Sequence, residues 1–520
     1  MNRRLPIGIQ DFAKIREGGY SYVDKTAQIH KLVTGSGGVF FLSRPRRFGK
    51  SLLCSTVRAL FEGRRDLFSG LAIDGLDWEW KKHPVIHLDL NPGDYTQGVS
   101  TLNGQLNITF ELFEKSYGLP HGVKDDPAGR FRQFITNVTE KTGERVVVIV
   151  DEYDKPLLAT IDAPETHTKI RSALKGFYAV LKSYDHYLKF VLLTGVTKFS
   201  QVSVFSDLNN LTDISLNPVF YDICGITQNE LETAFQPEID EVAKTRGIDR
   251  DGYLAKLKQF YNGYRFSEYT DTVYNPFGLL NHFFNHGKFE TYWFSTGTPT
   301  FLIKLIEQQK VDILRLERSA FTLAAMHRFN VDNMDALAVL YQTGYLTIVD
   351  YDGEFNEYTL DYPNEEVRSA FANALLEQYI HVSAMDLNAL AITLPRALIK
   401  GDINAAMNSL PPFFSGLPYD IQIKDEKYYQ TVLHLIFRML GLYCRSEVRI
   451  AAGRIDTLVE AGKYVYCFEF KLDGTAEEAL AQIDTKEYLL PWEGSGKQLV
   501  KIGVSFDYGK RNIGEWKTAA

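Results

Sequence analysis

A stretch near the N-terminus combines the residue types that bind phosphate. An apolar run at 39–42 is followed by a polar loop, and Lys50-Ser51 begins a segment with helical periodicity. Backbone N–H groups at a helix N-terminus bind anions, a lysine in such a loop contacts the β- and γ-phosphates, and the adjacent serine hydroxyl can ligate Mg²⁺. The general pattern G-x-x-x-x-G-K-[ST] has glycine where this sequence has Arg44, so the loop departs from it. The residues expected to contact a nucleotide are Arg46, Arg47, Phe48, Gly49, Lys50, Ser51 and Leu52.

A β-branched run at 146–150 ends in two acids. A strand buried on both faces that ends in carboxylates is typical of the Mg²⁺ side of a nucleotide site. We expect Asp151 to hold the metal together with Ser51, and Glu152 to polarise the attacking water. Thr194 ends a further apolar run, where its hydroxyl would sense the terminal phosphate. The alternative is an ordinary central strand and a strand-end threonine whose polar ends are simply solvated.

Near the C-terminus, acids and a lysine alternate along two neighbouring strands. If Gly462-Lys463 are the central residues of a hairpin turn, Asp456 directly opposes Glu469, and Lys471 lies on the same side because side chains alternate. This arrangement suits a site in which the two acids hold Mg²⁺ while Lys471 orients a water molecule and stabilises charge at phosphorus. The competing interpretation is a salt-bridged, solvent-facing side of a sheet.

The pattern of elements predicts how these residues are positioned. Apolar runs at 39–42, 85–90, 146–150 and 190–194 alternate with helical segments, which predicts an α/β domain on a parallel sheet. The segment 226–330 has a helical, aromatic-rich pattern. A helix at 335–345 followed by strands on either side of Asp352-Gly353 predicts a winged-helix-like unit. Its acidic wing favours packing on protein over binding DNA.

A proline-rich stretch at 411–418 indicates a boundary. Helix, strands and a second helix follow it and predict a mixed α/β domain. The expected domains are 1–225, 226–330, 331–412 and 413–520.

The composition and charge of the sequence limit the classes of protein to which it can belong. The net charge of the 520 residues is −8, and the segment from 421 onward has fourteen basic and fourteen acidic residues, so nucleic acid would need a local basic patch. The four cysteines are scattered without a C-x-x-C pair, which disfavours zinc and disulfide frameworks and suits a reducing cytoplasm. The N-terminus lacks a signal-peptide pattern and no apolar run is long enough to span a membrane, so we expect a cytoplasmic protein without membrane contact.

Four motifs carry a resemblance to a known family: 5–12, 22–26, 44–51 and 151–156. They resemble the bacterial AAA-ATPase-like family, whose members usually end in a PD-(D/E)XK nuclease-superfamily domain, and the family's own loop accepts Arg44. The resemblance implies a P-loop NTPase sheet and a C-terminal restriction-endonuclease-like fold. It also implies that Gln482, six residues before Tyr488, belongs to the nuclease site, and that Glu426 supplies an additional acid, with Glu447 as competitor.

The function expected from these observations is binding and hydrolysis of a nucleotide, with ATP (or GTP) and Mg²⁺ as cofactors. It is coupled to a Mg²⁺-dependent nuclease-like domain acting on nucleic acid. The alternative is a regulatory ATPase switch whose nuclease-like domain only binds a partner. A homo-oligomer is compatible with either. The sequence does not distinguish DNA from RNA as substrate.

Overall fold

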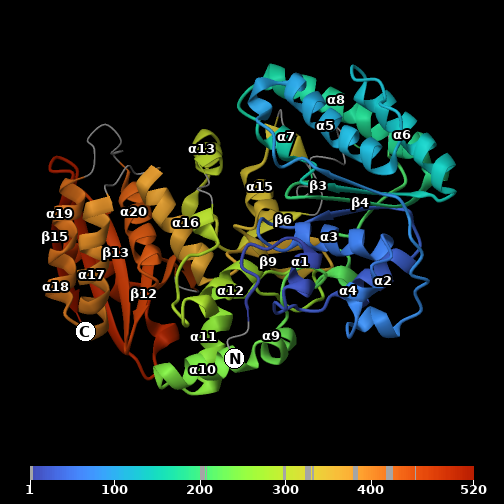
Figure 1. Cartoon of the computed structure of the whole chain (residues 1–520). Helices are drawn as coiled ribbons and strands as arrows, with labels where there is room; N and C mark the ends of the chain where they lie inside the picture. Colours follow the sequence, from blue (N-terminus) through green and yellow to red (C-terminus); the bar gives the residue numbers. More distant parts are fainter. Residues whose placement is uncertain are drawn as a thin grey trace. The chain divides into compact units, whose positions relative to one another are not determined.

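The structure is a computed structural model that describes residues 4–198, 205, 208–296, 300–322, 329–330, 333–378, 384–416, 425–450 and 453–519. The chain forms two compact units (Figure 1). Unit 1 comprises Met1–Trp293 and Ala320–Asn364, and unit 2 comprises Phe294–Ser319 and Glu365–Ala520. Among the described residues, no helix combines the length and apolar character needed to cross a membrane.

Unit 1 is built on a parallel five-stranded sheet with the order β2-β3-β4-β1-β5. The strands are β1 (Val39–Ser43), β2 (Val85–Asp89), β3 (Val146–Asp151), β4 (Leu188–Gly195) and β5 (Leu211–Asp213). All six residues of β3 are buried, as expected for a β-branched run covered on both faces. The predicted parallel α/β sheet is therefore confirmed.

This strand order explains how the first site can assemble. Because the strands are parallel, their carboxyl ends meet at one edge of the sheet. β4 lies between β1 and β3, so Thr194 separates the loop after β1 from Asp151-Glu152 after β3. Residues more than a hundred positions apart in the chain are thus brought to one edge.

Helices cover both faces of this sheet. Figure 1 shows α5 (Val99–Tyr117), α6 (Pro127–Thr142) and α8 (Pro164–Ser183) gathered on one side of β3 and β4, with α3 (Lys50–Phe61) on the other. The smaller helices α1 (Phe12–Glu17), α2 (Thr26–Thr34), α4 (Arg65–Phe68) and α7 (Lys155–Leu158) complete this layer structure.

The remainder of unit 1 is a helical cluster and a helix–hairpin element. The cluster contains α9 (Gln228–Ala234), α10 (Gln236–Arg246), α11 (Arg250–Tyr261) and α12 (Pro276–Phe284), joined by an aromatic-rich core. The helix–hairpin element contains α15 (Ala336–Thr343), β9 (Thr347–Asp352) and β10 (Glu357–Asp361). The two strands pair antiparallel in a sheet of order β6-β10-β9, with β6 at Ser319–Thr322. Short strands β7 (Phe329–Asn330) and β8 (Asn333–Met334) pair with each other.

Unit 2 is built on a mixed sheet with the order β11-β12-β13-β14-β15. Its strands are β11 (Tyr443–Ile450), β12 (Gly453–Ala461), β13 (Tyr464–Leu472), β14 (Gln498–Asp507) and β15 (Asn512–Ala519). Only β13 and β14 pair parallel among these strands. The predicted C-terminal mixed α/β sheet is confirmed.

Two helices pack on opposite faces of the β13 strand. Phe437 of α20 (Glu426–Met439) contacts Phe468, whereas Ile483 of α21 (Ala476–Thr485) packs with Cys467. Adjacent strand residues point to opposite faces. Glu469 therefore faces α21. The other helices of unit 2 are α13 (Thr300–Gln308), α16 (Glu365–Gln378), α17 (Ala384–Lys400), α18 (Ile403–Asn408) and α19 (Leu410–Ser415).

The two units do not follow the four segments expected from the sequence. The helices expected in a linker region up to 412 belong to unit 2 from Glu365 onward, and the segment 294–319 joins unit 2 although it precedes part of unit 1. Ion pairs attach that segment to α20, with Lys427 Nζ 2.6 Å from Asp312 Oδ2 and Arg438 paired with Glu317. Pairings between residues so far apart in sequence leave no local compositional signal, which is why the chain reads as separate segments.

Candidate nucleotide and metal sites

The Lys50 side chain folds back and donates hydrogen bonds to main-chain carbonyl oxygens of the loop after β1. Gly49 has φ +94°, which a residue with a side chain rarely adopts, and it begins α3. Lys50 is 3% exposed, and its Nζ donates to the carbonyl oxygens of Arg44 at 3.1 Å and Pro45 at 3.3 Å. The ammonium is thus fixed at the helix start, where a phosphate would be bound.

Glu152 balances the charge of this buried lysine. Its Oε1 lies 3.3 Å from Lys50 Nζ, and its backbone has φ +53°. Burial alone would lower the pKa of Lys50, but the charges of Glu152, Asp151 and Asp154 outweigh burial and raise that pKa. A phosphate that binds Lys50 must therefore compete with Glu152 for the ammonium.

Asp151 is oriented by hydrogen bonds. Thr194 Oγ1 donates to Asp151 Oδ1 at 2.6 Å, and the Glu152 N–H donates to the same oxygen at 3.1 Å. Asp151 and Thr194 are both buried. The structure therefore brings together Lys50, Asp151, Glu152 and Thr194, as the strand pattern predicts.

Asp154 is a structural acid at the same edge. It is buried and accepts hydrogen bonds from the N–H groups of Val196 and Thr197 and from the Thr197 hydroxyl. Burial, and then the charge of Glu152, raise its pKa to about 6. Asp154 therefore fastens the end of β4 to the turn after β3.

Arg44 explains why the loop dispenses with the usual first glycine. The side chain is buried, and it donates to the carbonyl oxygens of Ser43, Ser215 and Phe220 at 2.8–3.1 Å. Its guanidinium lies 4.0 Å from the centre of the Phe266 ring, and burial lowers its pKa to about 10. The positive backbone angles of the loop fall at Arg47, with φ +65°, and at Gly49, with φ +94°, and not at Arg44. Arg44 thus ties the loop to the segments around 215 and 266.

The other expected contact residues surround the same loop. Arg47 is exposed over the Phe277 ring, and Phe48 is buried against Tyr264 and Phe266. The Arg46 carbonyl accepts from Trp293 Nε1 at 2.9 Å, and its guanidinium donates to the Tyr345 hydroxyl at 3.4 Å. The sequence did not single out Trp293 and Tyr345 as supports of the loop. Ser51 and Leu52 are half-buried at the helix start.

An apolar cavity of about 100 Å³ opens beside the first turn of α3. Gly49, Leu52 and Leu53 line one side of it. The N-terminal segment, including Tyr22 and Val23, lines another side. A flat apolar ligand group attached to phosphates at Lys50 would find an apolar site here.

Two more side chains approach Asp151 that sequence reasoning did not select, Cys54 of α3 and His87 of β2. The available signal was alternation, because a polar residue at 87 in an otherwise apolar strand shares a face with Asp89.

In unit 2 the hairpin register is the expected one. Thr457 pairs with Phe468 and Leu458 with Cys467, the register expected from a turn at Gly462-Lys463. Asp456 and Glu469 are the next positions along the two strands, beyond the paired residues. Asp456 Oδ2 accepts from the Phe470 N–H at 2.9 Å, and Gln430 Nε2 donates to the Asp456 carbonyl at 2.6 Å. These bonds hold the Asp456 backbone and carboxylate beside β13.

Glu469 is the centre of this second site. It is 1% exposed, and its Oε1 accepts from Gln482 Nε2 and lies 3.4 Å from Lys471 Nζ. Gln482 also donates to the Tyr488 hydroxyl at 3.2 Å. Glu469 Oε2 is buried and has no hydrogen-bond partner. A buried carboxylate oxygen without a partner beside a second carboxylate fits a divalent cation.

Burial, and then the charge of Asp456, raise the pKa of Glu469 to about 8, although Lys471 opposes the shift. Without a cation the carboxyl group therefore favours its protonated form at neutral pH.

Glu426, the first residue of α20, lies beside the end of β13. Its Oε2 accepts from the Leu472 N–H at 2.9 Å, so this carboxylate caps the strand end. The side chain of Glu447 lies outside the described residues.

Comparison with known proteins gives three findings. The family model described as predicted AAA-ATPase matches residues 6–205, and the model of the PD-(D/E)XK nuclease superfamily matches residues 424–516. An uncharacterised protein in the vnfD 5′ region of Azotobacter chroococcum mcd 1 is 38% identical over 522 residues, covering 98% of each chain. A solved structure of the Aeropyrum pernix ORC1 protein in complex with DNA has 10% identity and a TM-score of 0.26, covering 68% of this chain and 92% of that chain.

The raised pKa of Glu469 predicts a pH-dependent stability in the absence of metal. The folded state holds the proton more tightly than the unfolded state, so this stability is fully present below about pH 4.5 and is lost as the pH rises through about 8. In EDTA, Glu469→Gln should melt at the same temperature as wild type near pH 4.5 and several degrees higher near pH 9, measured by scanning calorimetry. Glu493→Gln, an exposed acid in the same unit, should follow wild type at both values. Parallel pH profiles for Glu469→Gln and wild type would contradict the assignment.

Proposed function

Because the chain belongs to the predicted AAA-ATPase-like family and carries a C-terminal PD-(D/E)XK nuclease-superfamily domain, we propose that it couples nucleotide hydrolysis to cleavage of nucleic acid phosphodiesters. The nucleotide is ATP or GTP, and Mg²⁺ is the metal at both sites. The observation that carries the proposal is the convergence of Lys50, Asp151, Glu152 and Thr194 at one sheet edge.

In the nucleotide site each residue has a separate task. Lys50 and the N-terminus of α3 bind the β- and γ-phosphates. Ser51 and Asp151 are placed to hold Mg²⁺, which when bound would neutralise charge on the phosphates. Glu152, released from Lys50 by phosphate, accepts a proton from the attacking water, and Thr194 fixes the Asp151 carboxylate.

The apolar cavity beside Gly49 and Leu52 supports a purine-base position in the same site. It is continuous with the helix start that carries Lys50, so one ligand would occupy both. Its walls are mostly apolar, which favours binding by packing over the base faces.

In the second site Asp456 and Glu469 would hold the cation, which supplies charge neutralisation at the scissile phosphate. Lys471 orients the attacking water and stabilises developing negative charge. Gln482 positions Glu469 through its amide and is in turn oriented by Tyr488.

One observation favours the alternative function. Gln482 donates a hydrogen bond to Glu469 and Lys471 pairs with it, and burial raises the pKa of this carboxyl group. A regulatory ATPase whose nuclease-like domain binds a partner without cutting would be compatible with these contacts. A cleavage assay with and without EDTA separates the two functions.

Lys50→Ala should lower nucleotide affinity by an order of magnitude or more, because it removes a charge-assisted contact with phosphate. Isothermal titration calorimetry with a non-hydrolysable ATP analogue and Mg²⁺ measures this, and Lys82→Ala, an exposed lysine of the same unit, is the matched control. Equal affinities for Lys50→Ala and wild type would show that the nucleotide does not bind at this loop.

Glu152→Gln should retain nucleotide binding and slow hydrolysis roughly a hundredfold, the scale expected when water activation is lost. Phosphate release measured at saturating nucleotide tests this, with Glu111→Gln as an exposed control. If Glu152→Gln hydrolyses at the wild-type rate while Asp151→Ala is inactive, Glu152 serves only as the counter-ion of Lys50.

The roles proposed for Lys471 and Glu469 predict that their alanine variants lose different properties. Lys471→Ala should lose cleavage by roughly a hundredfold but keep the thermal stabilisation given by Mg²⁺ or Mn²⁺, whereas Glu469→Ala should lose both. The full chain is assayed at low salt on single- and double-stranded DNA and RNA with nucleotide present, because the neutral C-terminal segment predicts salt-sensitive binding. Lys463→Ala, in the turn of the same hairpin, should cut like wild type. Wild-type rates in both site variants would place the activity elsewhere.

A further inference from the structure

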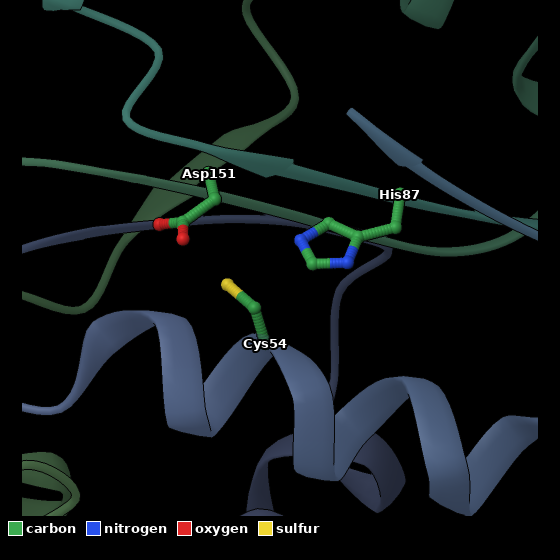
Figure 2. Close-up of side chains that lie close together, drawn as sticks. All are labelled: Cys54, His87 and Asp151. Carbon is green, nitrogen blue, oxygen red and sulfur yellow. The ribbon is translucent and has the colours of Figure 1, made fainter. Parts of the chain in front are cut away.

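Three side chains from three separate elements converge behind the proposed phosphate loop. They are Cys54 of α3, His87 of β2 and Asp151 of β3 (Figure 2). One potential ligand atom from each, a thiol sulfur, an imidazole nitrogen and a carboxylate oxygen, lies within 4.8 Å of the others. Among the described parts of the chain, this is where three such groups meet at that distance.

The fold dictates this convergence. His87 pairs in register with Ile149, and Asp151 is two residues further along β3, so His87 and Asp151 share one face of the sheet. α3 packs over that face, and Cys54 lies one helical turn after Lys50. The helix that presents Lys50 to phosphate thus presents Cys54 to the other two side chains.

The orientation of the His87 ring indicates that one of its nitrogen atoms is available to bind a metal ion. Figure 2 shows the ring nitrogen farther from the main chain directed at the space between the Asp151 carboxylate and the Cys54 sulfur. That atom, Nε2, is buried and has no hydrogen-bond partner.

The surroundings also favour a cation. Thr194 and the Glu152 N–H both donate to Oδ1 of Asp151, which leaves Oδ2 for another partner. Asp89 is the register partner of Asp151, so a second carboxylate extends from the same face of the sheet beside it. A cation between these groups would relieve the repulsion among the carboxylates.

We propose that Cys54, His87 and Asp151 form a binding site for a transition-metal ion of the Zn²⁺ class. Thiolate and imidazole are the ligands that Zn²⁺ and Co²⁺ prefer, whereas Mg²⁺ takes oxygen ligands. Three protein ligands leave one tetrahedral position for water. Cys54 releases its thiol proton to solvent as the sulfur–metal bond forms. The bond to the metal stabilises the thiolate and drives this deprotonation.

The site shares Asp151 with the nucleotide centre. If Asp151 holds the nucleotide's Mg²⁺, as proposed above, the two cations compete for its Oδ2, because Oδ1 already accepts two hydrogen bonds. The transition metal would then inhibit nucleotide hydrolysis. This consequence rests on the proposed function, but the metal site itself does not.

The test is a Co²⁺ titration of the full chain, freed of metal by chelation and assayed without nucleotide. Wild type should show the near-ultraviolet absorption band of a thiolate–cobalt bond, and Zn²⁺ should abolish the band by displacement. Cys54→Ala should lose the band, and His87→Phe should weaken Co²⁺ affinity at least tenfold. Cys467→Ser, a buried cysteine of unit 2, should retain the band with unchanged affinity.

Three results would overturn the proposal: no band in folded wild type, a band that persists in Cys54→Ala, or a band lost in Cys467→Ser. Should Cys54→Ala fail to fold, His87→Phe and Asp151→Asn decide, and wild-type affinity in both rejects the site. A saturating Mg²⁺-nucleotide analogue should reduce Co²⁺ affinity at least tenfold. A nucleotide that does not bind at all refutes the proposed function and leaves the Co²⁺ result standing, whereas simultaneous binding at full affinity refutes the shared carboxylate.

Discussion

The ammonium group of Lys50 is the constraint on which the first site depends. A buried cation is costly unless acids surround it, and here Glu152, Asp151 and Asp154 do so from the turn after β3. Those acids repel one another, so Thr194 and Thr197 at the end of β4 bind two of them through hydroxyl groups. These hydroxyl groups reach the acids because β4 lies between β1 and β3 in the sheet.

The two proposed sites balance their charges by different means. In unit 1 the balance is the ion pair of Lys50 and Glu152, which a bound phosphate would replace. In unit 2 the pKa of Glu469 is raised, so a bound cation would displace a proton from this carboxyl group. In the proposed function, each ligand therefore takes the place of an existing partner of a protein group.

Sequence reasoning reached the parts of these sites that periodicity controls. The β-branched run before Asp151 requires a buried strand, and the turn at Gly462-Lys463 determines which residues oppose each other, so the edge and the hairpin were predictable. The residues that support the loop were not predictable from the sequence. Trp293 and Tyr345 bind Arg46 although they are more than two hundred residues away in the chain, and no repeating pattern marks them. The role of Cys54 could not be predicted for a related reason. A cysteine on the apolar face of a helix resembles an ordinary core residue, and its proximity to His87 and Asp151 depends on how α3 packs on β2 and β3. The boundaries of the two units were not predictable because Asp312 and Glu317 pair with Lys427 and Arg438, and the whole hairpin element lies between these partners in the sequence.

The discontinuity of unit 2 affects how this protein is made and how it can change. Lys427 lies 115 residues beyond Asp312, so the segment 294–319 leaves the ribosome long before the helix that neutralises it exists. Meanwhile Trp293, the last residue before the first crossing, has already been tied to the phosphate loop through Arg46. The chain passes between the units three times, and no single cut in the gene yields the second unit whole. A cut before Glu365 would leave the second centre intact but would remove the segment 294–319, and with it Asp312 and Glu317, which pair with Lys427 and Arg438.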